Sequence, residues 1–160
     1  IELFNAANII FNSGREFELR ILGFEAEFTK QELLSLVPGH TDKVKFYPFS
    51  SQEFVAQQMS QCKAVAMPSF YESCGNGWIE AMACGTPVLG SKLSCGPEIV
   101  RDGIDGYLVD PNDIRSVSDG LDKLMFGPEL CAEDISSNAI HRFSVDSAVA
   151  ESMAIYQKLI

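Results

Sequence analysis

The sequence has few positive charges and no paired cysteines, and these absences exclude several classes of protein. Twelve Lys and Arg residues stand against 22 Asp and Glu residues, without a basic cluster, so the formal net charge is -10. Such a chain cannot neutralise the phosphates of nucleic acid, and we expect no nucleic-acid partner. Its five cysteines, without a Cys-x-x-Cys pair, predict neither a disulfide framework nor a zinc site. We expect reduced thiols, with Cys62 and Cys84 in the core.

Long apolar runs are absent as well. No stretch reaches the roughly 20 apolar residues that a membrane-spanning helix requires. The first ten residues lack the basic start of a signal peptide. With 160 residues, 46% of them hydrophobic and 21% charged, the composition is that of a folded domain. We expect a single cytoplasmic domain over residues 1–160.

Helix-like and strand-like segments alternate along the chain. This alternation predicts an α/β, Rossmann-like domain of three layers, with helices on both faces of a mainly parallel sheet. Helices are expected over residues 3–12, 29–37, 51–61, 77–84, 97–101, 114–126, 129–142 and 144–159, and strands over 18–23, 44–47, 64–67, 88–90 and 107–109.

Two carboxylates bracket a glycine-containing loop, Glu72-Ser-Cys-Gly-Asn-Gly-Trp-Ile-Glu80. The loop joins the apolar strand 64–67 to a helix, so it lies where open α/β sheets bind their ligands. The free N–H groups at a helix start favour an anion, and the two carboxylates can accept hydrogen bonds from hydroxyl groups. Phosphate together with a polyol indicates a sugar nucleotide. The alternative is that Gly75 and Gly77 only make a tight turn.

The wider pattern resembles a known family. After the loop come Cys84-Gly-Thr-Pro-Val88, Gly96-Pro-Glu98 and Gly106-Tyr-Leu-Val109. In this order the segments resemble the C-terminal, donor-binding domain of retaining glycosyltransferases of family 4, with the GT-B fold. The resemblance is close over residues 64–113 and looser from residue 18 to the C-terminus.

The resemblance implies a role for each residue of the loop. Glu72 would be catalytic, because it positions the donor sugar and stabilises the positive charge that develops on it. Retention would proceed by front-face displacement without a protein nucleophile. The family needs no metal and no cofactor in this domain, and its donor substrate is a UDP- or GDP-linked sugar. The donor-binding residues would be Ser73, Cys74, Gly75 and Asn76, through their backbone, and Glu80 at the ribose.

The sequence departs from the family pattern at two positions. Cys74 stands where an aromatic or aliphatic residue is common, and Pro48 where glycine is usual. Pro48 follows Phe46 and Tyr47 and precedes Phe49, near the place where the family binds the nucleotide base. These aromatic residues either contact the base or serve as packing.

The resemblance also implies missing parts. The family's domain begins with a strand, central in the sheet, and a Gly-Arg…Lys-Gly loop that holds the diphosphate, and both should precede Ile1. An N-terminal domain that binds the acceptor, a sugar or a lipid, is expected there too, and peripheral membrane association would depend on it. We therefore expect a fragment without its first strand, unable to catalyse transfer alone.

The sequence is also compatible with two other functions. One is a non-catalytic relic or interaction domain with the same fold. The other is a GT-B sugar-nucleotide epimerase, although the paired glutamates favour a transferase. The sequence leaves the base, the sugar and the acceptor undetermined.

Overall fold

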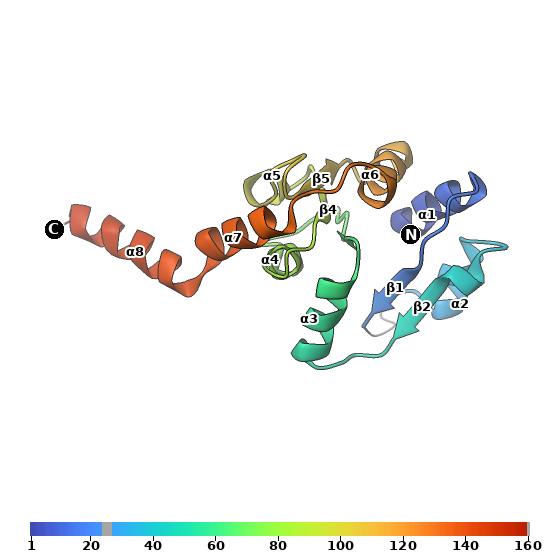
Figure 1. Ribbon diagram of the computed structural model, residues 1–160, viewed down its shortest axis with the longest axis horizontal. Helices are drawn as coiled ribbons and strands as arrows, with labels where there is room; N and C mark the ends of the chain where they lie inside the picture. Colours follow the sequence, from blue (N-terminus) through green and yellow to red (C-terminus); the bar gives the residue numbers. More distant parts are fainter. Residues whose placement is uncertain (24–26, 160) are drawn as a thin grey trace.

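The computed structural model describes residues 1–23 and 27–159. It confirms the alternation of helices and strands (Figure 1). The elements are α1 (Glu2–Asn12), β1 (Leu19–Leu22), α2 (Lys30–Ser35), the 3₁₀ helix η1 (Thr41–Lys43), β2 (Val44–Tyr47), α3 (Gln52–Gln61), β3 (Val65–Ala66), α4 (Asn76–Ala83), β4 (Val88–Ser91), α5 (Gly96–Ile99), β5 (Gly106–Val109), α6 (Ile114–Phe126), α7 (Ala132–Phe143) and α8 (Val145–Leu159).

Side-chain caps fix the starts of several helices. Ser51 accepts a hydrogen bond from the N–H of Phe54 at 3.3 Å, and α3 begins at the next residue. Thr29 and Glu32 form a reciprocal capping box at α2. Asp113 accepts a hydrogen bond from the N–H of Arg115 at the start of α6. Each cap satisfies an N–H group that has no partner within its own helix.

Most element boundaries differ from the prediction by one to three residues, and three of these differences are described here. The strand expected over 64–67 pairs only at Val65 and Ala66. Pro97 is not the first residue of α5, because Gly96 precedes it within the helix. The helix expected from residue 129 begins at Ala132, three residues later. In each case the apolar pattern located the element, whereas hydrogen bonding set its end.

All described strand pairs are parallel, as predicted, but they form two sheets. In one, β1 pairs with β2 from Leu19–Val44 to Leu22–Tyr47. In the other, β4 lies between β3 and β5. Among residues 1–23 and 27–159, no strand pairs with β1 on the side away from β2, or with β3 on the side away from β4. The parallel sheet is thus interrupted between β1 and β3.

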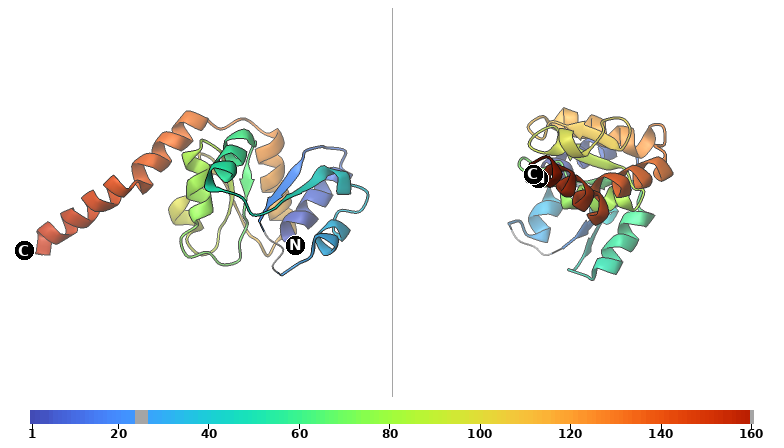
Figure 2. Two further views of the ribbon diagram at one scale, coloured as in Figure 1. Left: turned by 90° about the horizontal axis from the view of Figure 1, so that it is seen from below. Right: turned by 90° about the vertical axis from the view of Figure 1, so that its left-hand side faces the viewer.

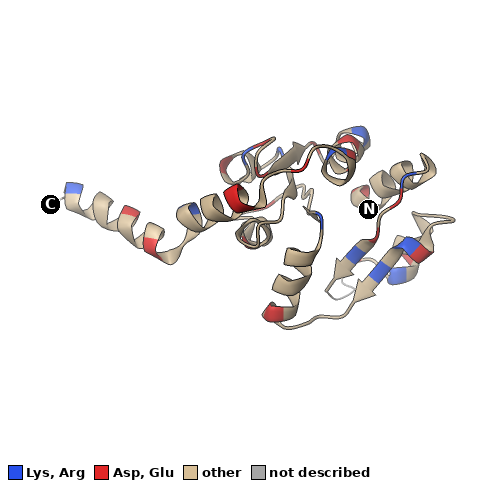
Figure 3. Ribbon diagram, viewed as in Figure 1, with Lys and Arg blue, Asp and Glu red and all other residues tan. Residues whose placement is uncertain are grey.

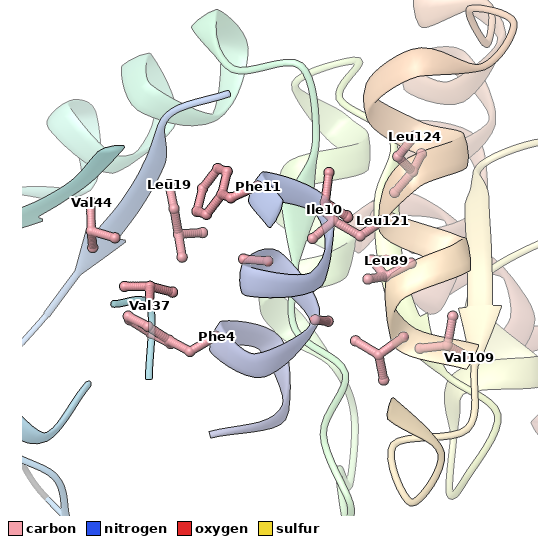
Figure 4. Close-up of a cluster of buried hydrophobic side chains, with 13 residues drawn as sticks. Phe4, Ile10, Phe11, Leu19, Val37, Val44, Leu89, Val109, Leu121 and Leu124 are labelled. Atoms are coloured by element: carbon pink, nitrogen blue, oxygen red, sulfur yellow. The ribbon is translucent and has the colours of Figure 1, made fainter. Parts of the chain in front are cut away.

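Helix α1 connects the two halves through one hydrophobic core. Figure 4 shows α1 in the centre, with Phe4 and Phe11 beside the Leu19 and Val44 of the two-stranded sheet. On its other side lie residues of β4, β5 and α6, among them Leu89. A second core cluster surrounds Trp78 of α4. The interruption in the sheet therefore does not divide the domain into two independent cores.

A groove of about 690 Å³ occupies the interruption. Residues 18–23 of the first sheet and 63–67 of the second line its two walls. Helix α3 contributes Val55 and Met59, and α6 contributes Leu121. The groove thus follows the free edges of both sheets.

The last helix stands apart from this core. Figures 1 and 2 show α8 projecting away from the rest of the domain, and none of its residues is buried. Its exposed apolar residues include Val149, Met153 and Tyr156. Within the described ranges, no helix combines the length and the apolarity that crossing a membrane would require.

Candidate functional site

The loop between Glu72 and Glu80 has the conformation of a built turn rather than a loose connection. Gly75 is the N-cap of α4 and has a left-handed φ of 60°. A Cβ added there would lie 2.4 Å from the ring of Trp78, and one at Gly77 would lie 2.7 Å from Met67. Glycine is thus required at Gly75 by its φ and by the Trp78 ring, whereas at Gly77 only the flexible end of the Met67 side chain would have to shift. The indole Nε1 of Trp78 donates to the carbonyl of Met67 at 3.2 Å, so that the loop is fixed to the end of β3.

This turn leaves a group of backbone donors available at the start of α4. The carbonyl of Gly75 accepts from the N–H groups of Trp78 and Ile79. By contrast, in the part of the chain that the structure describes, none of the N–H groups of residues 73–77 donates a hydrogen bond. Free N–H groups and the positive end of a helix dipole together form an anion site. The geometry can therefore hold a phosphate or diphosphate at Ser73, Cys74, Gly75 and Asn76.

The two carboxylates differ in their surroundings. Glu72 is half-buried just before the turn, and Glu80 is exposed on the second turn of α4. Because Glu80 reaches solvent, it needs no protein partner to compensate for burial. Neither carboxylate forms a hydrogen bond or ion pair with another described residue. Both are free to accept hydrogen bonds from a ligand.

A second glycine loop follows β4 and approaches the first. Ser94 has a φ of 53°, the one positive φ among the described residues other than glycine. A Cβ at Gly96 would lie 1.7 Å from the carbonyl oxygen of Ser91, so only glycine fits there. Burial raises the pKa of the Cys95 thiol, and the charges of Glu72 and Glu98 raise it further. Because β3 and β4 are parallel neighbours, the two loops that follow them leave the sheet at the same edge.

Few positive charges accompany these loops. Within residues 68–80 and 91–98, Lys92 is the single Lys or Arg. Figure 3 instead shows basic residues on β1 and β2, which carry Arg20 and Lys45. In the loops themselves, backbone N–H groups far outnumber charged donors. An anion bound there would depend mainly on those N–H groups and on the dipole of α4.

The structure brings out two aromatic residues that the sequence did not single out. Phe70 and Tyr71 directly precede Glu72 and are 50% and 81% exposed. Phe49, after β2, is 71% exposed, whereas Phe46 and Tyr47 are half-buried. Large exposed aromatic rings at the ligand-binding edge of a sheet offer stacking surfaces. The sequence could have indicated these two residues, because Phe70 and Tyr71 lie between the end of a predicted strand and the carboxylate of Glu72.

The cysteines are all free thiols. Cys62 and Cys84 are half-buried rather than core residues, and the prediction that placed them in the core was wrong. Burial nevertheless raises the pKa of the Cys62 thiol. Over residues 1–23 and 27–159, no group of three or more His, Cys, Asp or Glu residues is arranged to hold a metal ion.

The family model for glycosyl transferases group 1 matches residues 2–142. The chain is also similar to the D-inositol 3-phosphate glycosyltransferase of Actinosynnema mirum, with 35% identity over 133 residues. That alignment covers 80% of this chain and 32% of the relative. The same enzyme of Streptomyces griseus subsp. griseus is 33% identical over 120 residues, which are 74% of this chain and 25% of that protein. The chain thus spans between a quarter and a third of the length of these two relatives.

Solved structures share the fold over nearly the whole chain. The lipopolysaccharide outer core galactosyltransferase WaaB has a TM-score of 0.79 and 22% identity, and the match covers 98% of this chain and 44% of WaaB. Anabaena HepE in complex with UDP has a TM-score of 0.77 and 21% identity, covering 96% of this chain and 44% of that one. The glycine loops, the parallel sheets and these matches agree: the chain belongs to the group 1 glycosyl transferases and has the fold of a GT-B C-terminal domain.

Proposed function

We propose that this chain binds the nucleotide-diphospho-sugar donor of a retaining glycosyltransferase. The observation that carries the proposal is the turn at Gly75, which begins α4 between Glu72 and Glu80 and leaves the N–H groups of residues 73–77 without a hydrogen-bond acceptor among the described residues. A diphosphate accepts hydrogen bonds from these N–H groups. No metal is required for this arrangement, and no cofactor beyond the donor itself.

The carboxylates have separate roles in this proposal. Glu72 accepts hydrogen bonds from hydroxyl groups of the donor sugar and holds the sugar in place. As the bond to the diphosphate breaks, positive charge develops on the sugar, and the carboxylate of Glu72 stabilises it. Glu80 accepts hydrogen bonds from the ribose hydroxyl groups. The leaving diphosphate stays on the N–H groups at the start of α4.

The comparisons supply the first ligands to test. HepE, which shares the fold, was solved with UDP, so UDP is the first nucleotide to examine, with GDP second. The names of the curated relatives make D-inositol 3-phosphate the first acceptor. The acceptor would be held by a domain outside these 160 residues, and transfer requires that domain.

Binding of UDP, GDP and ADP to the 160-residue chain can be followed by NMR chemical-shift changes at Gly75 to Gly77. We expect UDP to shift these amides, and Glu80→Ala to weaken binding about tenfold, as expected for lost hydrogen bonds to a charged group. Glu151→Ala, on the exposed helix α8, is the matched control and should leave binding unchanged. If no nucleotide shifts these amides, or if Glu80→Ala binds as well as the unchanged chain, the proposed site is wrong.

A further inference from the structure

A second cavity, of about 260 Å³, lies at the edge of the three-stranded sheet opposite the candidate site. Residues that follow α3 and α4 and precede β3 and β4 line it, among them Lys63 and Pro87. Parallel neighbours begin at the same edge of a sheet, so this cavity lies at the amino ends of the strands, whereas the glycine loops lie at the carboxyl ends. The cavity therefore belongs to a part of the molecule that the proposed function does not use.

Two free thiols line this second cavity. Cys62 directly follows α3, Cys84 directly follows α4, and both residues are half-buried. The thiol of Cys62 donates to the carbonyl oxygen of Met59 at 3.2 Å. The hydroxyl of Thr86, two residues after Cys84, donates to the same oxygen at 2.6 Å. The sulfur of Cys62 thus lies next to the turn that follows α4.

Main-chain pairing holds the two cysteines at matching positions. The N–H of Val65 donates to the carbonyl of Pro87 at 3.0 Å, and β3 runs parallel to β4 from there. Cys62 stands three residues before Val65, and Cys84 stands three residues before Pro87. The helices that end at the two cysteines contact each other (Figure 1). Two thiols on adjacent chains that border one open space can approach each other without displacing a packed side chain.

We propose that Cys62 and Cys84 form a dithiol modification site, at which a low-molecular-weight disulfide converts the two thiols into one intramolecular disulfide. One thiolate of the pair attacks the reagent's disulfide, forms a mixed disulfide with it and releases one small thiol. The other then attacks the protein-bound sulfur, so that the protein disulfide forms and the second small thiol leaves. The two protons of the protein thiols end on the two released thiols. The reagent is thus reduced by the two electrons that the protein gives up.

The surroundings of Cys62 indicate the order of the two steps. Burial raises the pKa of its thiol, and the neighbouring Cys84 contributes to the rise. A raised pKa lowers the fraction of thiolate, which is the nucleophile. We therefore expect Cys84 to react first with the reagent. Cys62 then reacts within the molecule, where the mixed disulfide on Cys84 is held beside it.

The segment that this disulfide closes contains β3, the loop after Glu72 and α4. A covalent link between the two ends of the segment restricts the unfolded chain more than the folded one, and so stabilises the fold. Because the cavity lies at the opposite edge of the sheet, the link leaves the N–H groups of residues 73–77 accessible. The inference is therefore independent of the proposed donor site, and its test does not require a nucleotide.

Mass spectrometry of the folded chain after incubation with oxidised glutathione tests the proposal. We expect a loss of about 2 Da, for the two hydrogen atoms removed, and a cross-linked peptide pair that contains Cys62 and Cys84. The melting temperature should rise by about 5 °C or more, because the link constrains the unfolded chain. Dithiothreitol should reverse both changes.

Serine variants identify the two thiols. Cys62→Ser and Cys84→Ser should each abolish the cross-link and the rise in melting temperature. Cys131→Ser is the matched control, because Cys131 is exposed and its thiol donates to the Glu133 carboxylate at 3.5 Å. This control should form the cross-link as the unchanged chain does. Melting of each variant under reducing conditions verifies that it is folded.

Two outcomes would overturn the proposal. One is a cross-link in the folded chain that joins Cys74, Cys95 or Cys131 in place of Cys62 or Cys84. The other is a folded chain in which Cys62 and Cys84 stay unlinked, either as free thiols or as two separate glutathione adducts.

Discussion

The three-stranded and two-stranded sheets share one hydrophobic core but differ in how they are held. In the three-stranded sheet, β4 is paired on both sides and all four of its residues are buried. In the two-stranded sheet, β1 is paired on one side, and its Leu22 is exposed. Both glycine loops of the candidate site follow strands of the three-stranded sheet. The candidate donor loops are thus built on the half with more strand pairing and deeper burial.

The largest expected contrast is between two glycines. A Cβ at Gly106 in β5 would lie 1.9 Å from the carbonyl oxygen of Val88, so the backbone would have to move. Gly106→Ala should cost about 4 kcal/mol or more of unfolding free energy. Gly23, at the end of β1, has a φ of 123° but no atom within 4 Å of an added Cβ, so Gly23→Ala should cost about 1–2 kcal/mol from strain alone. Urea unfolding of both variants measures the difference, and equal losses would show that the two sheets are equally constrained.

Two ion pairs give the next contrast. Asp105, fully buried before β5, accepts from Nε and Nη2 of Arg101 at 2.8 and 2.6 Å. Arg101→Met should cost about 3 kcal/mol, because it leaves a buried carboxylate without its guanidinium. Arg15 and Asp122 form an exposed pair on the surface, and Arg15→Met should cost less than about 1 kcal/mol. Urea denaturation midpoints measure both losses of stability. A larger loss for Arg15→Met than for Arg101→Met would contradict this prediction.

The loss of stability in acid should be similar in the two regions, because in each region a carboxylate accepts a hydrogen bond from a nearby backbone N–H group. The N–H of Asn112 lowers the pKa of Asp110, after β5, and the N–H of Thr29 lowers that of Glu32, beside the two-stranded sheet. A lowered pKa stabilises the fold above the ordinary values of 3.8 and 4.5, and this stabilisation is lost as pH falls through the folded-state pKa.

Asp110→Asn and Glu32→Gln should therefore lower the melting temperature at pH 7, and this deficit should shrink as the pH falls through the lowered pKa of each carboxylate in the folded chain. Melting scans across this range provide the measurement. A deficit that persists undiminished in acid would exclude the carboxylate charge as its cause.

The smallest effect is expected from α8, which belongs to neither sheet. Deleting residues 145–159 removes no buried side chain. We expect the unfolding free energy to change by about 0.5 kcal/mol or less. A calorimetric melt of the shortened chain checks this, and a loss of several degrees would show that α8 supports the fold through α7.

Prediction from the sequence succeeded where local chemistry decides the structure. Three helices begin directly after Ser51, Thr29 and Asp113, because each of these caps forms a local hydrogen bond. Prediction was less accurate where contacts between residues far apart in the sequence decide the structure. The length of β3 depended on its partner β4, and the half-buried state of Cys62 and Cys84 depended on how α3, α4 and α7 pack. The aromatic residues Phe70 and Tyr71 gave no periodic signal, so only the structure showed their exposure.

For the candidate site, the sequence by itself determined the order of Glu72, the glycines and Glu80, and with it the family. It also predicted that an anion bound at these loops would depend on N–H groups, because the loops carry a single lysine. Only the tertiary structure decided that Gly75 is required by contact with Trp78, that Glu80 is exposed, and that the sheet is interrupted between β1 and β3. The physical reason is that motif order is written along the chain, whereas burial, close contact and strand pairing depend on residues far apart in it.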